Sequence, residues 1–154
     1  LQIPSLQGLN LQVKWPNDLY SLQGKWGGIL VEPFSVNQAI VGVGINLNTP
    51  PVENADQPIT SLHRLGLHQI ERLNLIAELY TAIQQAAQWF EHGSYNLAER
   101  FNHHAIWLNQ QVEFEHAQGK LQGRFQGISN DGAVIIKTDQ AQQFYQCRLR
   151  LAEI

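Results

Sequence analysis

The stretch from Lys14 to Glu32 holds the residues best suited to chemistry. Within it, Lys25 stands close to two adjacent glycines, Gly27 and Gly28, on a predicted strand that faces a turn at 16–18. Glycine lets a ligand lie against the backbone, and an ammonium group donates hydrogen bonds to a carboxylate or phosphate. The pattern therefore suits an anion. Spacing alone favours a simpler hairpin, in which the lysine is solvated and the glycines serve strand packing.

Other catalytic signatures are missing from the sequence. It has no G-x-x-x-x-G-K-[ST] phosphate loop, no H-E-x-x-H zinc motif and no paired cysteines. His103 and His104 are neighbours whose side chains diverge by about 100° on a helix, so we prefer surface or packing roles to metal binding. Gly42 and Gly44 form a G-x-G inside a predicted strand that no helix follows, which excludes a Rossmann fold.

The elements expected to position this stretch are strands. Apolar and polar residues alternate from Leu9 to Trp15, the two-residue period of a half-buried strand. Further strands are predicted at 19–20, 25–32 and 39–46, with turn residues between them. Together they predict an antiparallel meander.

Helices are predicted next. Between about Ile70 and His92 the period changes to that of an amphipathic helix. The expected apolar stripe consists of Leu73, Ile76, Tyr80, Ile83, Ala87 and Phe90. Gly93 ends this helix, and Ser94 is the predicted N-cap of a second one that ends near Ala105.

The last part of the chain reads as short strands again. After Leu108 the period returns to two, and turn signals such as Asn130-Asp131-Gly132 separate the apolar pairs. Four or five strands of this kind predict a small barrel. We therefore expect two domains, at 1–107 and 108–154.

Composition narrows the class of protein. The 154 residues carry a formal net charge of −3, which gives no general attraction for nucleic acid. No apolar run approaches the roughly 20 residues of a membrane span, and no signal peptide is recognisable. A single cysteine, Cys147, excludes a disulfide framework and fits a reducing, cytoplasmic location. Because the sequence contains no methionine, we expect it to be a fragment of a longer protein.

Three segments carry a resemblance to a known family. They are KWPND at 14–18, KWGGILVE at 25–32 and GVGINLN at 42–48. These segments resemble the K-W-P-N-D, K-x-x-G-I-L-x-E and G-x-G-I-N-x-N motifs of biotin–protein ligases, in the same order. A looser similarity continues to the end of the chain. The whole chain thus resembles the C-terminal part of the ligase catalytic domain plus the C-terminal domain.

This resemblance implies a fold and a reaction. The fold is α+β, with a truncated mixed central sheet that has helices on one side, followed by a small all-β barrel of the Src-homology-3 kind. The implied ligands are ATP, biotin and Mg²⁺, which give biotinyl-5'-AMP and pyrophosphate. A lysine of the biotin carboxyl carrier protein of a carboxylase then attacks the mixed anhydride. No membrane or nucleic-acid partner is expected, and homodimer formation stays open.

The resemblance also implies roles for single residues. Lys25 matches the catalytic lysine that contacts the biotin carboxylate and the α-phosphate, where a fixed cation stabilises developing negative charge. Asn17 and Asp18 match the turn that faces the nucleotide and its magnesium. For Asp18 a turn-closing role is equally open. Asn46 matches a residue near the adenine, and strand-end capping is the alternative.

Glycines and tryptophans complete the expected site. Gly27, Gly28 and Gly44 would form a bare floor under biotin or the adenylate, whereas Trp15 and Trp26 are expected in the core.

Two departures from the family limit these assignments. The basic G-R-G-R-x-G-R loop and the Ser/Thr segment that binds the biotin ureido ring are not found in the sequence. We therefore expect this chain alone to lack significant ligase activity.

The end of the chain departs as well. The family's final strand resembles G-E-V-S-L-R, whereas this chain has Cys147-Arg148-Leu149-Arg150-Leu151-Ala152, so neither arginine is assigned a role. The segment Thr49–Ile59 matches the adenylate-covering loop in position only. It carries no large aromatic residue.

Two alternatives remain from other classes of protein. The terminal segment, 108–154, could be a binding module without catalytic function, because it carries more positive charge than its neighbours. The basic residues are Lys120, Arg124, Lys137, Arg148 and Arg150. The acidic overall balance and the lack of an aromatic ladder argue against nucleic acid as its ligand. A lipoate-attaching relative would share the core fold. The G-x-G-I-N motif and the terminal barrel favour biotin.

Overall fold

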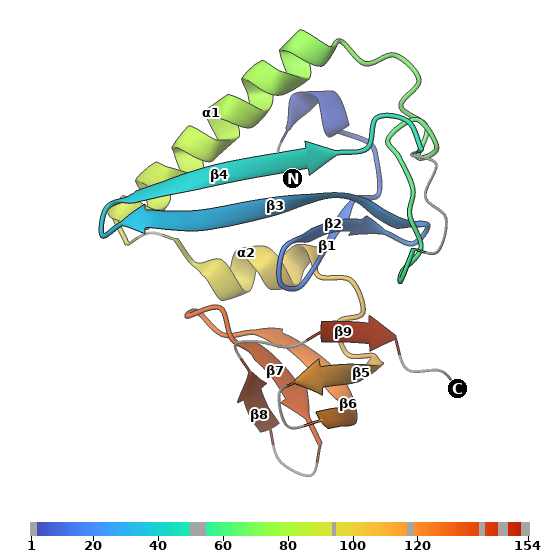
Figure 1. Cartoon of the computed structure of the whole chain (residues 1–154), viewed down its shortest axis with the longest axis vertical. Helices are drawn as coiled ribbons and strands as arrows, with labels where there is room; N and C mark the ends of the chain where they lie inside the picture. The colour runs from blue at the N-terminus through green and yellow to red at the C-terminus, as the bar shows by residue number, and fades with distance from the viewer. Residues whose placement is uncertain are drawn as a thin grey trace. The chain divides into compact units, whose positions relative to one another are not determined.

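The computed structural model describes residues 3–49, 55–93, 95–116, 119–138, 141–144 and 148–151 (Figure 1). The chain divides into two compact units, Leu1–Tyr95 and Asn96–Ile154. The expected domain boundary at 107/108 differs from this division in one respect. Helix α2 (Leu97–His104) belongs to the second unit.

In its described residues, the first unit contains one sheet, a short 3-10 helix and one long α-helix. Its elements are η1 (Pro4–Leu6), β1 (Gln12–Lys14), β2 (Asp18–Ser21), β3 (Gly24–Ser35), β4 (Gln38–Ile45) and α1 (Arg72–Glu91). The strands follow the order β1-β2-β3-β4, and every pairing is antiparallel. The predicted meander is thus confirmed, while the expected mixed sheet is wrong for these four strands. The local turns explain this, because each strand folds back on the one before it.

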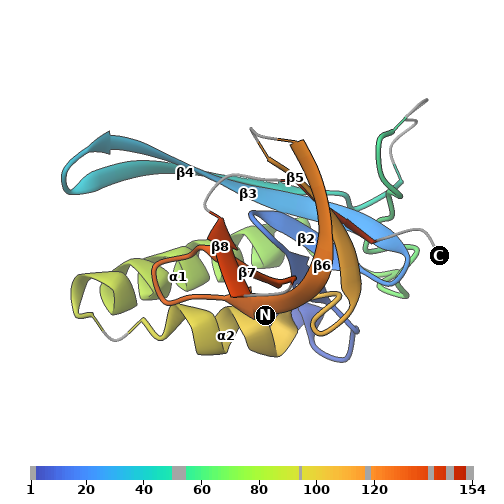
Figure 2. The same cartoon turned by 90° about the horizontal axis from the view of Figure 1, so that it is seen from below.

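Strands β3 and β4 form a long hairpin that extends past β2 (Figure 2). Its far half exposes apolar side chains, among them Leu30 at 55%, Phe34 at 75% and Ile40 at 60%. The near half, which begins at Gly24, lies against the core and carries the predicted site residues.

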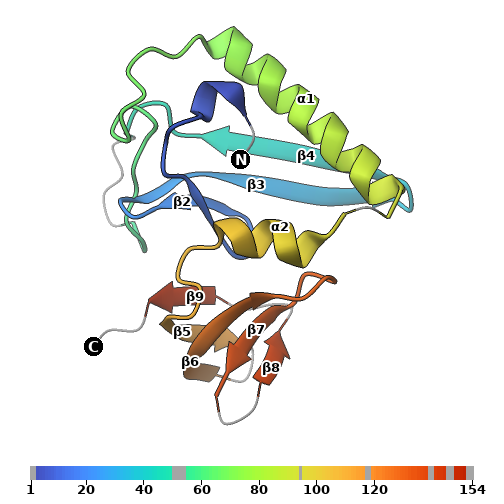
Figure 3. The same ribbon diagram turned by 180° about the vertical axis from the view of Figure 1, so that it is seen from behind.

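The core of the first unit lies where the sheet meets α1 and η1. Helix α1 crosses the sheet on the face turned toward the viewer in Figure 3. The buried cluster consists of Leu6, Leu11, Leu19, Trp26, Leu62 and Leu75. Trp26 is 1% exposed, and its indole N–H donates to the Tyr20 carbonyl at 2.8 Å. The expected burial of Trp15 and Trp26 is confirmed.

Helix α1 was predicted in the right place but with the wrong apolar face. Leu73 and Tyr80 of the predicted stripe are 79% and 62% exposed. Leu75 is buried instead, and Leu79, four residues later, packs against the same cluster. These two leucines lie one turn apart on one side of the helix, so they form a second stripe that competes for the core. Neither described helix has the length and apolar character needed to span a bilayer.

The part of the second unit that the structure describes contains a five-stranded antiparallel sheet and one helix. Its strands are β5 (Gln111–His116), β6 (Gly119–Ile128), β7 (Val134–Lys137), β8 (Ala141–Phe144) and β9 (Arg148–Leu151). They follow the order β8-β7-β6-β5-β9. Val112 and Phe114 of β5, and Val134 and Ile136 of β7, are fully buried and alternate as predicted. The predicted N-cap Ser94 lies outside the described residues.

The Asn102 side chain of α2 makes two hydrogen bonds to the end of β6. The Asn102 amide accepts from the Ile128 N–H at 2.8 Å and donates to the Ile128 carbonyl at 3.2 Å. Gly127 has a φ of +101°, and a Cβ there would lie 2.4 Å from the Asn102 side-chain oxygen. Glycine is therefore required beside the asparagine, both for the backbone conformation and for space.

Candidate active site

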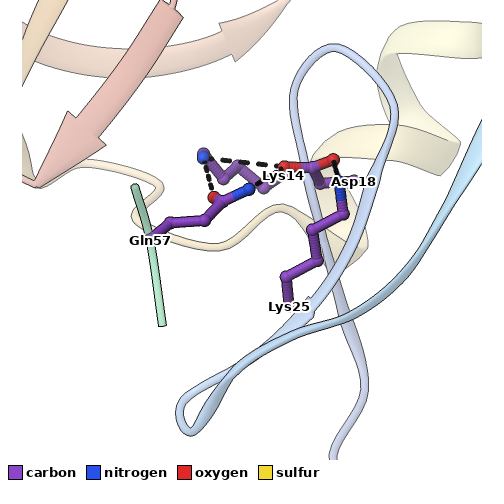
Figure 4. Close-up of polar contacts among 4 residues, drawn as sticks. All are labelled: Lys14, Asp18, Lys25 and Gln57. Carbon is purple, nitrogen blue, oxygen red and sulfur yellow. Dashed lines mark hydrogen bonds and ion pairs between the residues drawn. The ribbon is translucent and has the colours of Figure 1, made fainter. Parts of the chain in front are cut away.

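The predicted catalytic lysine pairs with the predicted metal ligand. Lys25 Nζ lies 2.6 Å from Asp18 Oδ1, and the two side chains are 33% and 13% exposed (Figure 4). Strands β2 and β3 bring them together, because Asp18 lies opposite Gly28 in the antiparallel register. A Cβ at Gly28 would lie 3.7 Å from Lys25 Nζ, so the glycine keeps open the space beside the ammonium group.

A β-bulge between β2 and β3 lies where Lys25 of the site and Trp26 of the core follow each other. Leu19 and Tyr20 of β2 pair with Gly27 and Lys25, which leaves Trp26 as an extra residue in β3. Such a bulge changes the direction in which the neighbouring side chains point. Trp26 is buried in the core, whereas Lys25 reaches the Asp18 carboxylate.

A second lysine joins the pair from β1. Lys14 Nζ lies 3.7 Å from Asp18 Oδ2 and donates to Gln57 Oε1 at 2.5 Å. It also lies 5.3 Å from the centre of the Tyr20 ring. Burial lowers the pKa of Lys14 below the usual 10.5, and Lys25 adds to this effect, while attraction to Asp18 opposes it. Burial and the Asp18 carboxylate raise the pKa of Tyr20, which keeps the phenol neutral.

The fourth member of the cluster comes from a distant segment. Gln57 Nε2 donates to Asp18 Oδ2 at 3.0 Å, so this amide contacts both Asp18 and Lys14. Backbone hydrogen bonds fix the segment on β3: the Lys25 N–H donates to the Pro58 carbonyl at 2.9 Å, and the Thr60 N–H donates to the Lys25 carbonyl at 2.8 Å.

Gly24 makes this backbone contact possible. Its φ is +123°, and a Cβ would lie 2.5 Å from the Pro58 carbonyl oxygen. Any larger residue at this position would push the segment away from Lys25. Sequence reasoning assigned no function to Gly24, Lys14 or Gln57. Lys14 stood inside a recognised motif, but no spacing signal connects Gln57 with Asp18, 39 positions away.

The cluster of Lys14, Asp18, Lys25 and Gln57 has a formal charge of +1, from two ammonium groups and one carboxylate. An additional anionic oxygen would therefore be attracted to it. The lysine donors are already oriented by Asp18, so less freedom is lost when an anion binds. A carboxylate or a phosphate is the ligand that this chemistry favours.

The three predicted floor glycines differ in their surroundings. A Cβ at Gly27 would lie 2.4 Å from the Gly44 carbonyl, so close strand packing by itself requires glycine there. At Gly44 a Cβ would meet nothing nearer than the Gly28 carbonyl at 4.0 Å. Gly28 and Gly44 lie opposite each other in the register and share one face of the sheet. That face leaves room for a ligand beside Lys25.

The two asparagines lie at the ends of strands. The Asn17 carbonyl accepts from the Ile29 N–H at 2.9 Å, and Asn17 itself is exposed in the turn before β2. Asn46 follows β4 directly, and its side chain donates to the Thr60 carbonyl at 3.2 Å. Asn46 thus ties the Thr60 segment to the sheet, as the alternative of strand-end capping requires. Its adenine contact stays a prediction.

Asp18 does not have the surroundings of a resident magnesium ligand. The described residues contain no group of three His, Cys, Asp or Glu side chains that could hold a metal ion. Asp18 Oδ1 faces Lys25, and Oδ2 faces Lys14 and Gln57. Two ammonium groups on one carboxylate repel a further cation, so the residues present do not fit a bound Mg²⁺.

Comparison with known proteins identifies the family. Residues 1–46 match the model of the Biotin/lipoate A/B protein ligase family, and residues 107–144 match that of the Biotin protein ligase C terminal domain. The chain belongs to the biotin protein ligase family. The first match contains all three sequence motifs up to Asn46, and with them Lys14, Asp18 and Lys25.

Curated members of the biotin protein ligase family align with most of the chain. The bifunctional ligase/repressor BirA of Escherichia coli is 30% identical over 84% of the chain and 42% of its own length. The biotin–[acetyl-CoA-carboxylase] ligase of Paracoccus denitrificans is 30% identical over 82% of the chain and 57% of its own length. The chain thus spans about half the length of the curated relatives it matches.

Solved structures support the same fold. The biotin protein ligase from Aquifex aeolicus in complex with biotin and ATP has a TM-score of 0.79 and 24% sequence identity. The alignment covers 92% of this chain and 62% of that chain. At this identity the similarity concerns the fold alone.

Proposed function

We propose that this chain is part of an enzyme that activates biotin with ATP to biotinyl-5'-AMP and then transfers biotin to a lysine of a biotin carboxyl carrier protein. The observation that carries the proposal is the pair of lysines, Lys14 and Lys25, held on Asp18 inside the region that matches the ligase family. The Biotin protein ligase C terminal domain match at 107–144 favours biotin over lipoate as the acyl group.

The two steps place different demands on the site. In the first, a biotin carboxylate oxygen attacks the α-phosphorus of ATP, and pyrophosphate leaves. In the second, the carrier lysine amine attacks the mixed anhydride carbonyl, and AMP leaves. Both transition states gather negative charge on oxygens, and the Lys25 ammonium would stabilise that charge. Asp18 holds Lys25 in position before the ligand arrives.

The remaining site assignments belong to the same proposal. Gly28 and Gly44 would lie under the adenylate, Asn17 would face the nucleotide and Asn46 would lie near the adenine. Magnesium would arrive with the ATP phosphates, because Asp18 is already neutralised by lysines. We also propose domains at 1–107 and 108–154, the second a Src-homology-3-like barrel, and a cytoplasmic location.

The test is biotin-dependent ATP–pyrophosphate exchange by the longest polypeptide that the gene encodes. Lys25→Ala should lower the exchange rate about 100-fold, as expected for the loss of a donor to developing negative charge. Lys120→Ala is the matched control, because Lys120 also pairs with a carboxylate, Glu113 at 3.2 Å, but lies in the second unit. It should leave the exchange rate unchanged.

The opposite results would be equally informative. A folded wild-type protein without biotin-dependent exchange would overturn the ligase proposal. Exchange that depends on lipoate in place of biotin would assign the chain to the lipoate-attaching relatives. Equal losses in Lys25→Ala and Lys120→Ala would remove the specific role of Lys25.

A further inference from the structure

The Gln57 side chain completes the lysine cluster in a way that few residues could. It accepts from the Lys14 ammonium group at 2.5 Å and donates to the Asp18 carboxylate at 3.0 Å. A carboxamide is both an acceptor and a donor, so it satisfies a cation and an anion at once. A glutamate would keep the contact to Lys14 but repel Asp18. A methionine would fill similar space and make neither hydrogen bond.

The position of Gln57 does not depend on its own side chain. The next residue, Pro58, accepts the Lys25 N–H at 2.9 Å, and Thr60 donates to the Lys25 carbonyl at 2.8 Å. Asn46 adds a third contact, through its side chain to the Thr60 carbonyl. These bonds fix the segment against β3. Replacing the Gln57 side chain therefore changes the polar contacts of the cluster and leaves the backbone contacts in place.

Without Gln57, Lys14 would lose a partner that holds it at a fixed place. Lys14 is 10% exposed in its side chain, and its distance of 3.7 Å to Asp18 exceeds that of a good hydrogen bond. The Gln57 oxygen is nearer, at 2.5 Å. The amide thus sets the direction of the Lys14 ammonium group, while Asp18 Oδ1 is engaged by Lys25.

We propose that Gln57 is a positioning residue, which holds the Lys14 ammonium group beside Lys25 so that both can meet the phosphate oxygens of a nucleotide. This inference rests on the proposed function for the identity of the ligand. The coupling between Gln57 and Lys14 stands independently of that function, and it can be measured without catalysis.

The kinetic test compares two substitutions in biotin-dependent ATP–pyrophosphate exchange. Gln57→Met should lower kcat/KM for ATP about tenfold, the effect of one lost hydrogen bond to a charged group. Gln57→Glu should lower it further, because a second carboxylate would repel the phosphates. The KM for biotin should change less than about twofold in either variant, since Gln57 contacts Lys14 and Asp18, whereas the biotin carboxylate is assigned to Lys25. Gln85→Met on the exposed face of α1 is the matched control and should behave as wild type.

The second readout is the pKa of Lys14, followed by NMR with isotope-labelled lysine in the same polypeptides. Gln57→Met should lower this pKa further, because the charged form loses an acceptor. Gln57→Glu should raise it, because a carboxylate replaces a neutral amide. A purely space-filling role would leave the pKa unchanged in Gln57→Met, while the new carboxylate of Gln57→Glu would raise it in either case.

The outcomes separate the two proposals. Wild-type exchange together with an unchanged kcat/KM in Gln57→Met would overturn the positioning role and leave the ligase function standing. No exchange in wild type would overturn the ligase function. In that case a lowered pKa of Lys14 in Gln57→Met would still support the coupling of Gln57 to Lys14, and an unchanged pKa in that variant would overturn it. Unfolding midpoints of both variants near that of wild type would exclude loss of folding as the cause.

Discussion

At the scale of single residues, Asp18 acts through the two lysines that it contacts, Lys14 and Lys25. Asp18 Oδ1 faces Lys25, and Oδ2 faces both Lys14 and Gln57. Asp18→Asn should therefore lower the exchange rate about tenfold, because the two ammonium groups lose the charge that holds them together. The magnesium concentration that gives half the maximal rate should stay as in wild type. A large increase in that concentration would instead identify Asp18 as a metal ligand.

Lys14 gives the site a dependence on alkaline pH. Burial lowers the pKa of Lys14, and Lys25 contributes, while Asp18 and Asp56 oppose the shift. Tyr20, the ring beside it, stays neutral because its own pKa is raised. As pH rises through the lowered pKa, Lys14 loses its charge and its attraction for an anion. It does so earlier than an ordinary lysine would.

Lys14→Arg tests this dependence. Arginine keeps its charge over the whole accessible range, so the alkaline fall in exchange should move to higher pH. At neutral pH the rate should fall, because a planar guanidinium does not reproduce the contact of a single ammonium group. The pH–rate profiles of wild type and variant provide the measurement. An alkaline limb that stays in place would show that another group controls it.

Contiguous motifs were sufficient to predict half of this cluster. Lys25 and Asp18 lie in short segments whose order was recognisable, and β2 and β3 bring them together through a local turn. Gln57 could not be predicted, because its contacts depend on how a loop 43 positions from Lys14 folds back. No pattern of residues along the chain indicates that this loop folds back to Lys14.

At the scale of elements, the contact between the Gln57–Thr60 segment and β3 depends on one glycine. Gly24→Ala should release the segment, because the new Cβ would collide with the Pro58 carbonyl and the residue has a φ of +123°. We expect the free energy of unfolding to fall by about 1–3 kcal/mol, together with a loss of exchange activity. Chemical denaturation and the exchange assay measure the two effects.

Gly66→Ala is the matched control for this prediction. Gly66 also has a positive φ, +105°, but a Cβ there would meet nothing within 4 Å. It should show the cost of the backbone conformation alone, about 1 kcal/mol, with normal activity. Equal behaviour of the two variants would mean that the close approach of Pro58 has no consequence for the site.

Periodicity predicted where the elements lie better than it predicted which face of an element packs against the core. The strands at 39–46 and the helix at 70–92 correspond to β4 (Gln38–Ile45) and α1 (Arg72–Glu91). The face of α1 could not be decided, because the sequence offers two apolar stripes and only packing selects the one with Leu75 and Leu79. The mixed sheet came from the family resemblance, whereas these four strands are antiparallel.

At the scale of the whole molecule, the chain spans about half the length of the curated relatives that it matches, such as 42% of the Escherichia coli ligase/repressor. The 154-residue sequence contains neither the basic glycine-rich loop nor the ureido-binding segment of the family. We therefore expect the 154-residue chain alone to show no biotin-dependent exchange above background. The longest polypeptide of the gene, assayed in parallel, is the control. Near-equal rates would show that exchange needs no residues besides these 154.

The bulge at Trp26 has a consequence for how this protein can change over time. Lys25 and Trp26 are adjacent, yet one contacts the anion cluster and the other fills the core. A substitution that repacks the tryptophan moves the peptide that carries the lysine, and a change that shifts the lysine disturbs the core. Selection for affinity and selection for stability therefore act on the same two residues, and neither property can be improved there without testing the other.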